Sequence, residues 1–130
     1  IWGDSSGNIY FSTTASIVKL NADGTHVSTI GSAGSGNGQF VWPGHVHRTA
    51  GGDFWVADSN NHRVQKFNSA GVYQSQFGTN GAGNGQLNTP LSLAVDSSGN
   101  IFVADTSNHR IQKFNSSGAY QSQFGTVGVG

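Results

Sequence analysis

Two histidines separated by one residue form a candidate pair of metal ligands in this sequence. His45 and His47 lie in the stretch Trp42-Pro43-Gly44-His45-Val46-His47-Arg48, and a spacing of two places both imidazoles on one face of a β-strand. Two imidazoles on one face can bind Zn²⁺ or Cu²⁺ when a third ligand joins them. We therefore take His45 and His47 as candidate metal ligands, within a candidate binding site of Trp42, His45, His47 and Arg48.

A second set of polar residues occurs twice with the same spacing. Its members are Asp58, Asn61, His62 and Arg63 in one copy and Asp105, Asn108, His109 and Arg110 in the other. The histidines could act as ligands or bases, and the arginines could hold an anion. An aspartate at a strand end can instead accept hydrogen bonds from the loop that follows, whose backbone groups must find partners. Because the set recurs with each repeat, we predict that it is structural.

The charge of the chain argues against several kinds of partner. Six basic residues balance six acidic ones, all of them aspartates, and charged residues make up 9% of the chain. Nucleic acid and anionic lipid are attracted by clustered Lys and Arg, so we expect no nucleic-acid partner. No run of about 18 apolar residues is present, so no membrane span is predicted.

Cysteine and methionine are both absent. Without cysteine neither a disulfide nor a thiolate metal site can form, and we expect no cofactor. A chain without methionine, even at position 1, is expected to be a processed product or a piece of a longer protein. The polar, turn-rich composition favours a secreted or cell-surface bacterial protein.

An internal repeat sets the elements that must position these residues. Val56–Gly78 recurs as Val103–Gly125, 47 residues later, and the two copies differ at only five positions. The glycine-rich linkers Gly31–Phe40 and Gly78–Leu87 repeat as well, and Gly125–Gly130 begins a third. A fixed period of this length indicates a repeat architecture.

An altered copy of the repeat opens the chain. DSSGNIYF (Asp4–Phe11) matches DSSGNIFV (Asp96–Val103), and IVKLNADG (Ile17–Gly24) matches IQKFNSSG (Ile111–Gly118). Between them, STTAS (Ser12–Ser16) replaces the segment that carries the Asp, His and Arg in the later copies. The predicted units are 1–31, 32–78 and 79–125, with 126–130 starting the next linker.

Each unit predicts four short strands. In the last unit these are 91–95, 101–104, 110–115 and 119–124, and Gly- and Asn-containing turns separate the members of each hairpin. No window shows the 3.6-residue period of a helix. Four strands in every 40 to 50 residues are typical of propeller blades, so the sequence predicts an all-β propeller segment of three four-stranded blades.

The unit PLSLAVDSSGNIFVADTSNHRIQKFNSSG (Pro90–Gly118) resembles the NHL repeat. The tripeptide that names this family corresponds to Asn61-His62-Arg63 and Asn108-His109-Arg110. The resemblance implies a β-propeller, commonly of six blades. The chain departs from the family pattern in its first unit, in PGHVHR (Pro43–Arg48) where an apolar strand is usual, and at Thr49 where an Asp is expected.

Three blades form an open fan, because each blade of a closed propeller packs on two neighbours. The two open faces would carry large apolar side chains, which drive association. Two copies related by a two-fold axis would close a six-bladed ring. We therefore expect either a homodimer of this kind or a segment of a longer propeller.

The resemblance leaves three functions open. The first strand of a blade lines the propeller channel, so His45 and His47 are expected there, as ligands or as polar residues in a wet channel with Arg48 paired to a nearby Asp. We predict a non-enzymatic binding or scaffold module that recognises a peptide, protein or glycan on one rim. One alternative is a self-assembling structural unit without a ligand. The other is a zinc-dependent lyase, because peptide-amidating lyases resemble NHL propellers and hold zinc on channel histidines.

Overall fold

The computed structural model describes residues 1–125, which form three antiparallel sheets of four strands each. Each sheet takes its strands from one continuous stretch of chain. The predicted all-β fold of three four-stranded units is confirmed. The expected start of a further linker at 126–130 lies outside the described residues.

The strands and short helices have the following bounds. The first sheet holds β1 (Trp2–Gly3), β2 (Ile9–Ser12), β3 (Ile17–Leu20) and β4 (His26–Ile30). The second sheet holds β7 (Pro43–Arg48), β8 (Phe54–Asp58), β9 (Arg63–Phe67) and β10 (Tyr73–Phe77). The third sheet holds β11 (Pro90–Val95), β12 (Ile101–Asp105), β13 (Arg110–Phe114) and β14 (Tyr120–Phe124). A parallel pair, β5 (Ser32–Ala33) and β6 (Gln39–Phe40), precedes the second sheet, and the 3₁₀ turns η1 (Ser59–Asn61) and η2 (Thr106–Asn108) follow β8 and β12.

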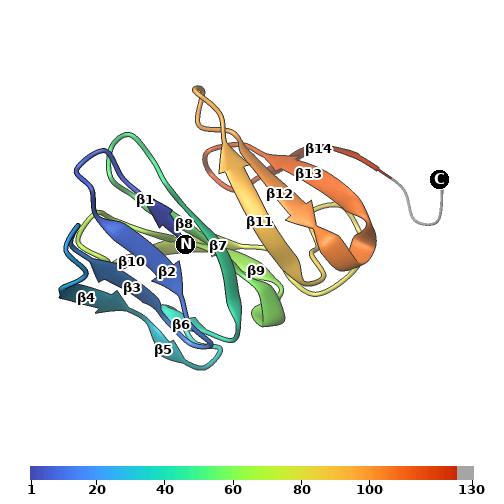
Figure 1. Ribbon diagram of the computed structural model, residues 1–130. Coiled ribbons are helices and arrows are strands. Elements are labelled where there is room, and N and C mark those ends of the chain that lie inside the picture. Colours follow the sequence, from blue (N-terminus) through green and yellow to red (C-terminus); the bar gives the residue numbers. More distant parts are fainter. Residues whose placement is uncertain (126–130) are drawn as a thin grey trace.

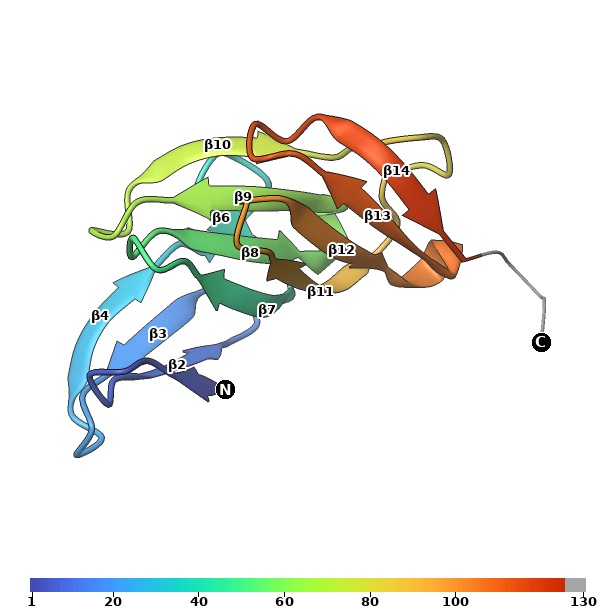
Figure 2. The same ribbon diagram turned by 90° about the horizontal axis from the view of Figure 1, so that it is seen from above.

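The three sheets lie side by side in chain order, with the second between the first and the third (Figure 1 and Figure 2). Strands β7 and β11 are close neighbours across the gap between the second and third sheets. Within residues 1–125, no helix is long and apolar enough to cross a membrane. The arrangement is a fan of blades whose first strands β1, β7 and β11 lie along its inner edge.

The hairpin turns close because side-chain oxygens bind nearby backbone amides. Asp96 Oδ1 accepts hydrogen bonds from the N–H groups of Ser98 and Asn100, each at 2.9 Å. Gly99 within this turn has φ 84°, a conformation that glycine adopts without the penalty of a Cβ. Asn115 closes the next hairpin of the same sheet in the same way.

The hydrophobic cores lie between the sheets, and β8 contributes to both. Phe54 and Val56 pack toward the first sheet, whereas Trp55 and Ala57 pack toward the third. This alternation is the two-residue period of a strand. All four side chains are at most 4% exposed, and full burial of a large apolar side chain is worth about 1.5–3 kcal/mol. The second sheet is therefore held on both faces.

The first sheet forms its four strands from a shorter stretch of chain than the other two sheets. Its β1 pairs with β2 over only Trp2 and Gly3, where β7 and β11 each run for six residues. The short loop between β2 and β3 closes on Thr13, whose Oγ1 accepts the N–H groups of Ala15 at 3.2 Å and Ser16 at 3.0 Å. A hydroxyl-based loop thus replaces the 3₁₀ turn of the later sheets.

Candidate functional site

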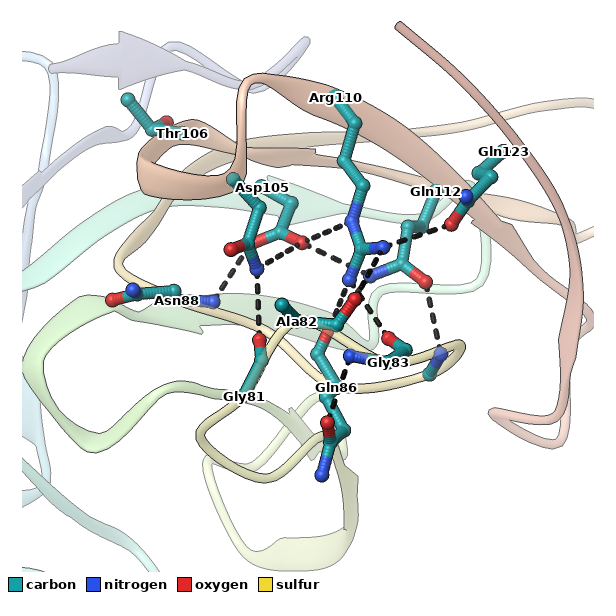
Figure 3. A network of polar contacts seen from close by, with 12 residues as sticks. Gly81, Ala82, Gly83, Gln86, Asn88, Asp105, Thr106, Arg110, Gln112 and Gln123 are labelled. Atoms are coloured by element: carbon teal, nitrogen blue, oxygen red, sulfur yellow. Dashed lines mark hydrogen bonds and ion pairs between the residues drawn. The ribbon is translucent and has the colours of Figure 1, made fainter. Parts of the chain in front are cut away.

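Each aspartate of the repeated polar set is the buried centre of a hydrogen-bond network. Asp105, at the end of β12, has no exposed surface. Its Oδ2 accepts hydrogen bonds from Arg110 Nε at 2.7 Å, Asn108 Nδ2 at 2.9 Å and Gln112 Nε2 at 3.1 Å (Figure 3). Its Oδ1 accepts the backbone N–H of Asn88 at 2.7 Å. Asp58 has the equivalent four partners in the second sheet.

The arginines of the set bind the glycine-rich linker that leads into their own sheet. Besides its bond to Asp105, Arg110 donates to the carbonyl groups of Ala82, Gly83 and Gln86 and to the side chain of Gln123 (Figure 3). Its five N–H groups are thereby all used. Arg63 repeats these five bonds in the second sheet. Neither guanidinium has a donor left for an anionic ligand.

Two buried glutamines complete the networks, and neither was among the site residues predicted from the sequence. Gln112 Nε2 donates to Gln86 O at 2.6 Å, and its Oε1 accepts the backbone N–H of Gly85 at 2.9 Å. Gln65 does the same in the second sheet. The available signal was a glutamine at the centre of the same strand in both units, RVQKF (Arg63–Phe67) and RIQKF (Arg110–Phe114). The network thus reaches beyond neighbouring strands to fix the linker.

His62 connects one sheet to the next. Its backbone is left-handed, with φ 55°, and its Nδ1 accepts the backbone N–H of Thr89 at 3.0 Å, just before β11 begins. His109 has nearly the same backbone, with φ 54°, and is exposed. The first sheet has no His at this point, and the carbonyl of Thr14 accepts the N–H of Trp42 at 2.8 Å instead.

Arg48 is bound to the first sheet. Its Nη1 lies 2.7 Å from Asp4 Oδ2, and its guanidinium carbon lies 5.9 Å from the Tyr10 ring centroid and 5.6 Å from that of Phe54. The side-chain hydrogen bond from Asn8 is the main cause that lowers the pKa of Asp4 to about 2, so the carboxylate is charged at neutral pH. Arg48 therefore joins two sheets, which leaves it poorly placed to hold a ligand.

His45 and His47 lie on β7 near one another. The His45 ring centroid is 6.3 Å from that of Trp2 on the first sheet. Burial is the main cause that lowers the pKa of both imidazoles, and the nearby charge of His45 lowers that of His47 further. Both rings are therefore neutral at pH 7, the form in which imidazole binds a metal. The described residues contain no group of three His, Cys, Asp or Glu side chains placed to hold one.

Trp42 stands apart from the other three candidate residues. Its side chain is 60% exposed, and its φ of 51° is rare for a bulky residue. Thr89, at the equivalent place before β11, has φ 52°. The left-handed backbone therefore belongs to the repeat, and the indole is an addition peculiar to the second sheet.

The surroundings of Trp42 are polar and carry few charges. The preceding residue, Val41, donates its N–H to Asp58 and accepts that of Asn60 in η1. Trp42 therefore lies at the edge of the fan that carries η1 and η2, which is the lower edge in Figure 1. We call this edge the NHR rim, after the Asn-His-Arg tripeptides that it carries. Exposed residues in the turns of this rim have hydroxyl, amide or imidazole side chains: Thr13, Thr14, Asn60, Thr106, Ser107 and His109.

Comparison with solved structures finds proteins that share this arrangement at low identity. A streptogramin B lyase has a TM-score of 0.72 and 17% identity, over 95% of this chain and 39% of that one. A protein of unknown function from Bacteroides caccae has a TM-score of 0.71 and 16% identity, over 98% and 45%. A periplasmic gluconolactonase of Pseudomonas aeruginosa has a TM-score of 0.66 and 17% identity, over 100% and 39%. The chain thus spans less than half the length of these proteins, and the likeness shows the fold alone.

Sequence comparison identifies the repeat itself. A search of the curated proteins found no match. The sequence profile of the NHL repeat matches residues 40–67 and 87–114, which contain the last residue of the linker, the first three strands and the Asp–Arg network of the second and third sheets. Residues 40–67 and 87–114 are therefore NHL repeats, and they lie in a chain that has the fold of a β-propeller segment.

Proposed function

We propose that the chain is a non-enzymatic binding module that recognises a peptide, protein or glycan on its NHR rim. The observation that carries the proposal is the exposed indole of Trp42 on a fixed backbone. Its amide is bonded to Thr14, and the residues on either side are held by Asp58 and by the start of β7. A rigid, amphipathic aromatic side chain provides contact area at little entropic cost and is typical of binding hot spots.

The charges around the rim favour a neutral ligand. Arg63 and Arg110 use their donors on the linkers, and Arg48 lies at the far end of β7, away from this rim. Each of the buried carboxylates Asp58 and Asp105 is paired with an arginine. Hydroxyl and amide groups around an indole suit a sugar or an uncharged peptide, whose polar groups they can bind while the ring covers an apolar surface.

Arrays of neutral glycans and peptides, probed with the chain and with Trp42→Thr, test this proposal. The variant copies Thr89, the residue that the repeat itself places on the same backbone, so the fold should be preserved. We expect at least a tenfold loss of affinity, equivalent to about 1.4 kcal/mol. Val72→Thr, at a 56% exposed position away from the rim, should bind like the parent. Equal binding by Trp42→Thr, or no binding on any array, would contradict the proposal.

A zinc-dependent lyase is the second candidate function, and it rests on the two neutral imidazoles of His45 and His47. Two ligands need at least one more for a catalytic site. Zinc titration of the metal-free chain separates the two functions: the lyase requires stoichiometric zinc that His45→Gln removes. A chain that ignores added zinc contradicts the lyase and leaves the rim proposal intact.

A further inference from the structure

The packing between the sheets is directional, because each sheet has two different faces. The face of the second sheet that packs on the third consists of Trp55, Ala57, Val64 and Phe77. Its opposite face, which packs on the first sheet, includes Val46, Phe54, Val56 and Phe67. The third sheet uses the equivalents of this opposite face, Leu93, Ile101, Val103 and Phe114, to cover the second. Both junctions therefore join unlike faces in the same order.

Within residues 1–125, one of these faces of the third sheet is left open. Phe102, Ala104, Ile111 and Phe124 occupy the places of Trp55, Ala57, Val64 and Phe77. Ile111 is 36% exposed and Phe124 is 56% exposed, whereas Val64 is fully buried. Residues of this open face line a shallow hollow of about 180 Å³. The ammonium of Lys113 lies 5.7 Å from the Phe102 ring centroid, as that of Lys66 lies 5.4 Å from Trp55.

The first sheet leaves the complementary face open. Ile9 pairs with Leu20 and Phe11 pairs with Val18 across β2 and β3, which places all four side chains on the face away from Tyr10 and Ile17. None of the four is fully buried. Val18 stands where the second and third sheets have the buried glutamines Gln65 and Gln112. The loss of that polar group makes β2 and β3 apolar across this face, and Thr29 and His26 of β4 border it.

We infer that a second copy of the chain docks the open face of its first sheet on the open face of the third sheet. The junction would repeat the two that already exist within the chain, with apolar side chains of the same kind on each side. The net charge of zero sets no long-range repulsion against it. Unlike faces joined head to tail give a closed ring or an open filament, according to the angle between copies.

In this junction between copies, the inner strands of the two sheets are expected to lie farther apart than β7 and β11 do. A Cβ on Gly44 would lie 2.4 Å from the carbonyl oxygen of Leu91, so glycine is what allows β11 to approach β7. Leu91 holds the place of Gly44 in the third sheet and is 48% exposed. In the docked pair its side chain would fill the space that separates the inner strands.

Light scattering after size exclusion, on the whole chain over a dilution series, tests the inference. We expect a mass near twice 13.5 kDa. Ile111→Lys on the third sheet and Phe11→Lys on the first should each reduce the mass to that of a monomer. Val72→Lys, at an exposed apolar position outside both faces, should leave it unchanged, and circular dichroism should show that all three variants fold.

Mixing supplies a sharper test, because each interface variant retains one intact face. An equimolar mixture of Ile111→Lys and Phe11→Lys should form a dimer through the single junction that still has two native faces. If the wild-type chain forms assemblies larger than a dimer and each variant abolishes them, the docking is supported. The ring then does not close after two copies. A wild-type monomer at all concentrations, or masses that neither variant changes, would overturn the inference.

Discussion

The Nδ1 atom of His62 accepts a hydrogen bond from the backbone N–H of Thr89 at 3.0 Å, and this bond ties the second sheet to the first residue before β11. The histidine of the NHR tripeptide is thus a link between blades, whereas its arginine holds the linker of its own blade. His109 occupies the same backbone conformation, with φ 54°. Within residues 1–125, no backbone N–H donates a corresponding hydrogen bond to the His109 ring.

Replacing His62 should therefore cost stability that replacing His109 does not. We expect His62→Asn to lower the free energy of unfolding by about 0.5–1.5 kcal/mol, the net value of one hydrogen bond. Because asparagine tolerates the left-handed region at both sites equally, His109→Asn is a matched control and should be nearly neutral. Urea denaturation measures both. Equal effects would show that the bond to Thr89 adds nothing.

The buried carboxylate of Asp58 should be among the most sensitive positions in the chain. Asp58→Ala leaves the buried Arg63 without its partner at 2.8 Å, and breaking a buried pair costs about 3–5 kcal/mol. Asp53→Ala is the control, because Asp53 and Lys66 form a partly exposed pair at 3.6 Å worth about 0–1 kcal/mol. A loss below 1 kcal/mol for Asp58→Ala in urea denaturation would mean that the network is not cooperative.

Gly44 should tolerate no side chain. Gly44→Ala places a Cβ 2.4 Å from the carbonyl oxygen of Leu91, and the third sheet must then move away from the second. Overpacking of this kind costs about 1–3 kcal/mol. Gly51→Ala is the control, because the nearest atom to a Cβ there is 3.9 Å away. Thermal unfolding, followed by circular dichroism, should show a lower Tm for Gly44→Ala and a parental Tm for Gly51→Ala. A parental Tm for Gly44→Ala would show that the sheets are not in close contact here.

The imidazoles of β7 should make stability depend on pH between 7 and 5. Burial lowers the pKa of His45 and His47 below the ordinary value of 6.5. The unfolded chain therefore binds more protons as the pH falls through 6.5, and the free energy of unfolding decreases. The lowered pKa values of Asp4 and Asp96 act in the same direction, but only below about pH 4, where unfolded aspartate is protonated.

The double variant His45→Gln, His47→Gln should flatten this dependence. Urea denaturation at pH 7, 6 and 5 measures it, with His26→Gln on the exposed strand β4 as the control. We expect the control to retain the parental slope. An unchanged slope in the double variant would assign the pH dependence to other groups.

The repeat and its turns could be predicted from sequence because they are local. The expected strands of the third sheet agree with β11 to β14 to within one residue at each end, since glycine, asparagine and aspartate mark each turn. The roles of individual polar residues could not be predicted, because they depend on contacts far apart in the chain. Arg48 reaches Asp4 across 44 residues, and Gln65 reaches the linker across 26.

The residues of Pro43–Arg48, where the chain departs from the NHL pattern, have different roles that the sequence alone does not distinguish. Gly44 allows close packing, Arg48 bridges two sheets, and Val46 is core. Trp42, His45 and His47 retain accessible surface, and of the two imidazoles that of His45 also interacts with the backbone of Leu93 on β11. The structural contacts of Gly44, Val46 and Arg48 are made with neighbouring sheets, so they become visible only in the folded arrangement.

Trp42 on the NHR rim is expected to contact the ligand directly. Two-dimensional NMR of ¹⁵N-labelled protein gives one indole N–H signal for each of Trp2, Trp42 and Trp55, and Trp42→Thr assigns that of Trp42. During titration with a glycan or peptide that binds on the arrays, we expect the Trp42 signal to shift together with the amides of Asn60 and Thr14. The signal of Trp55, which is 4% exposed, should stay in place. A Trp42 signal that remains fixed while amides on the opposite rim shift would contradict ligand binding at Trp42.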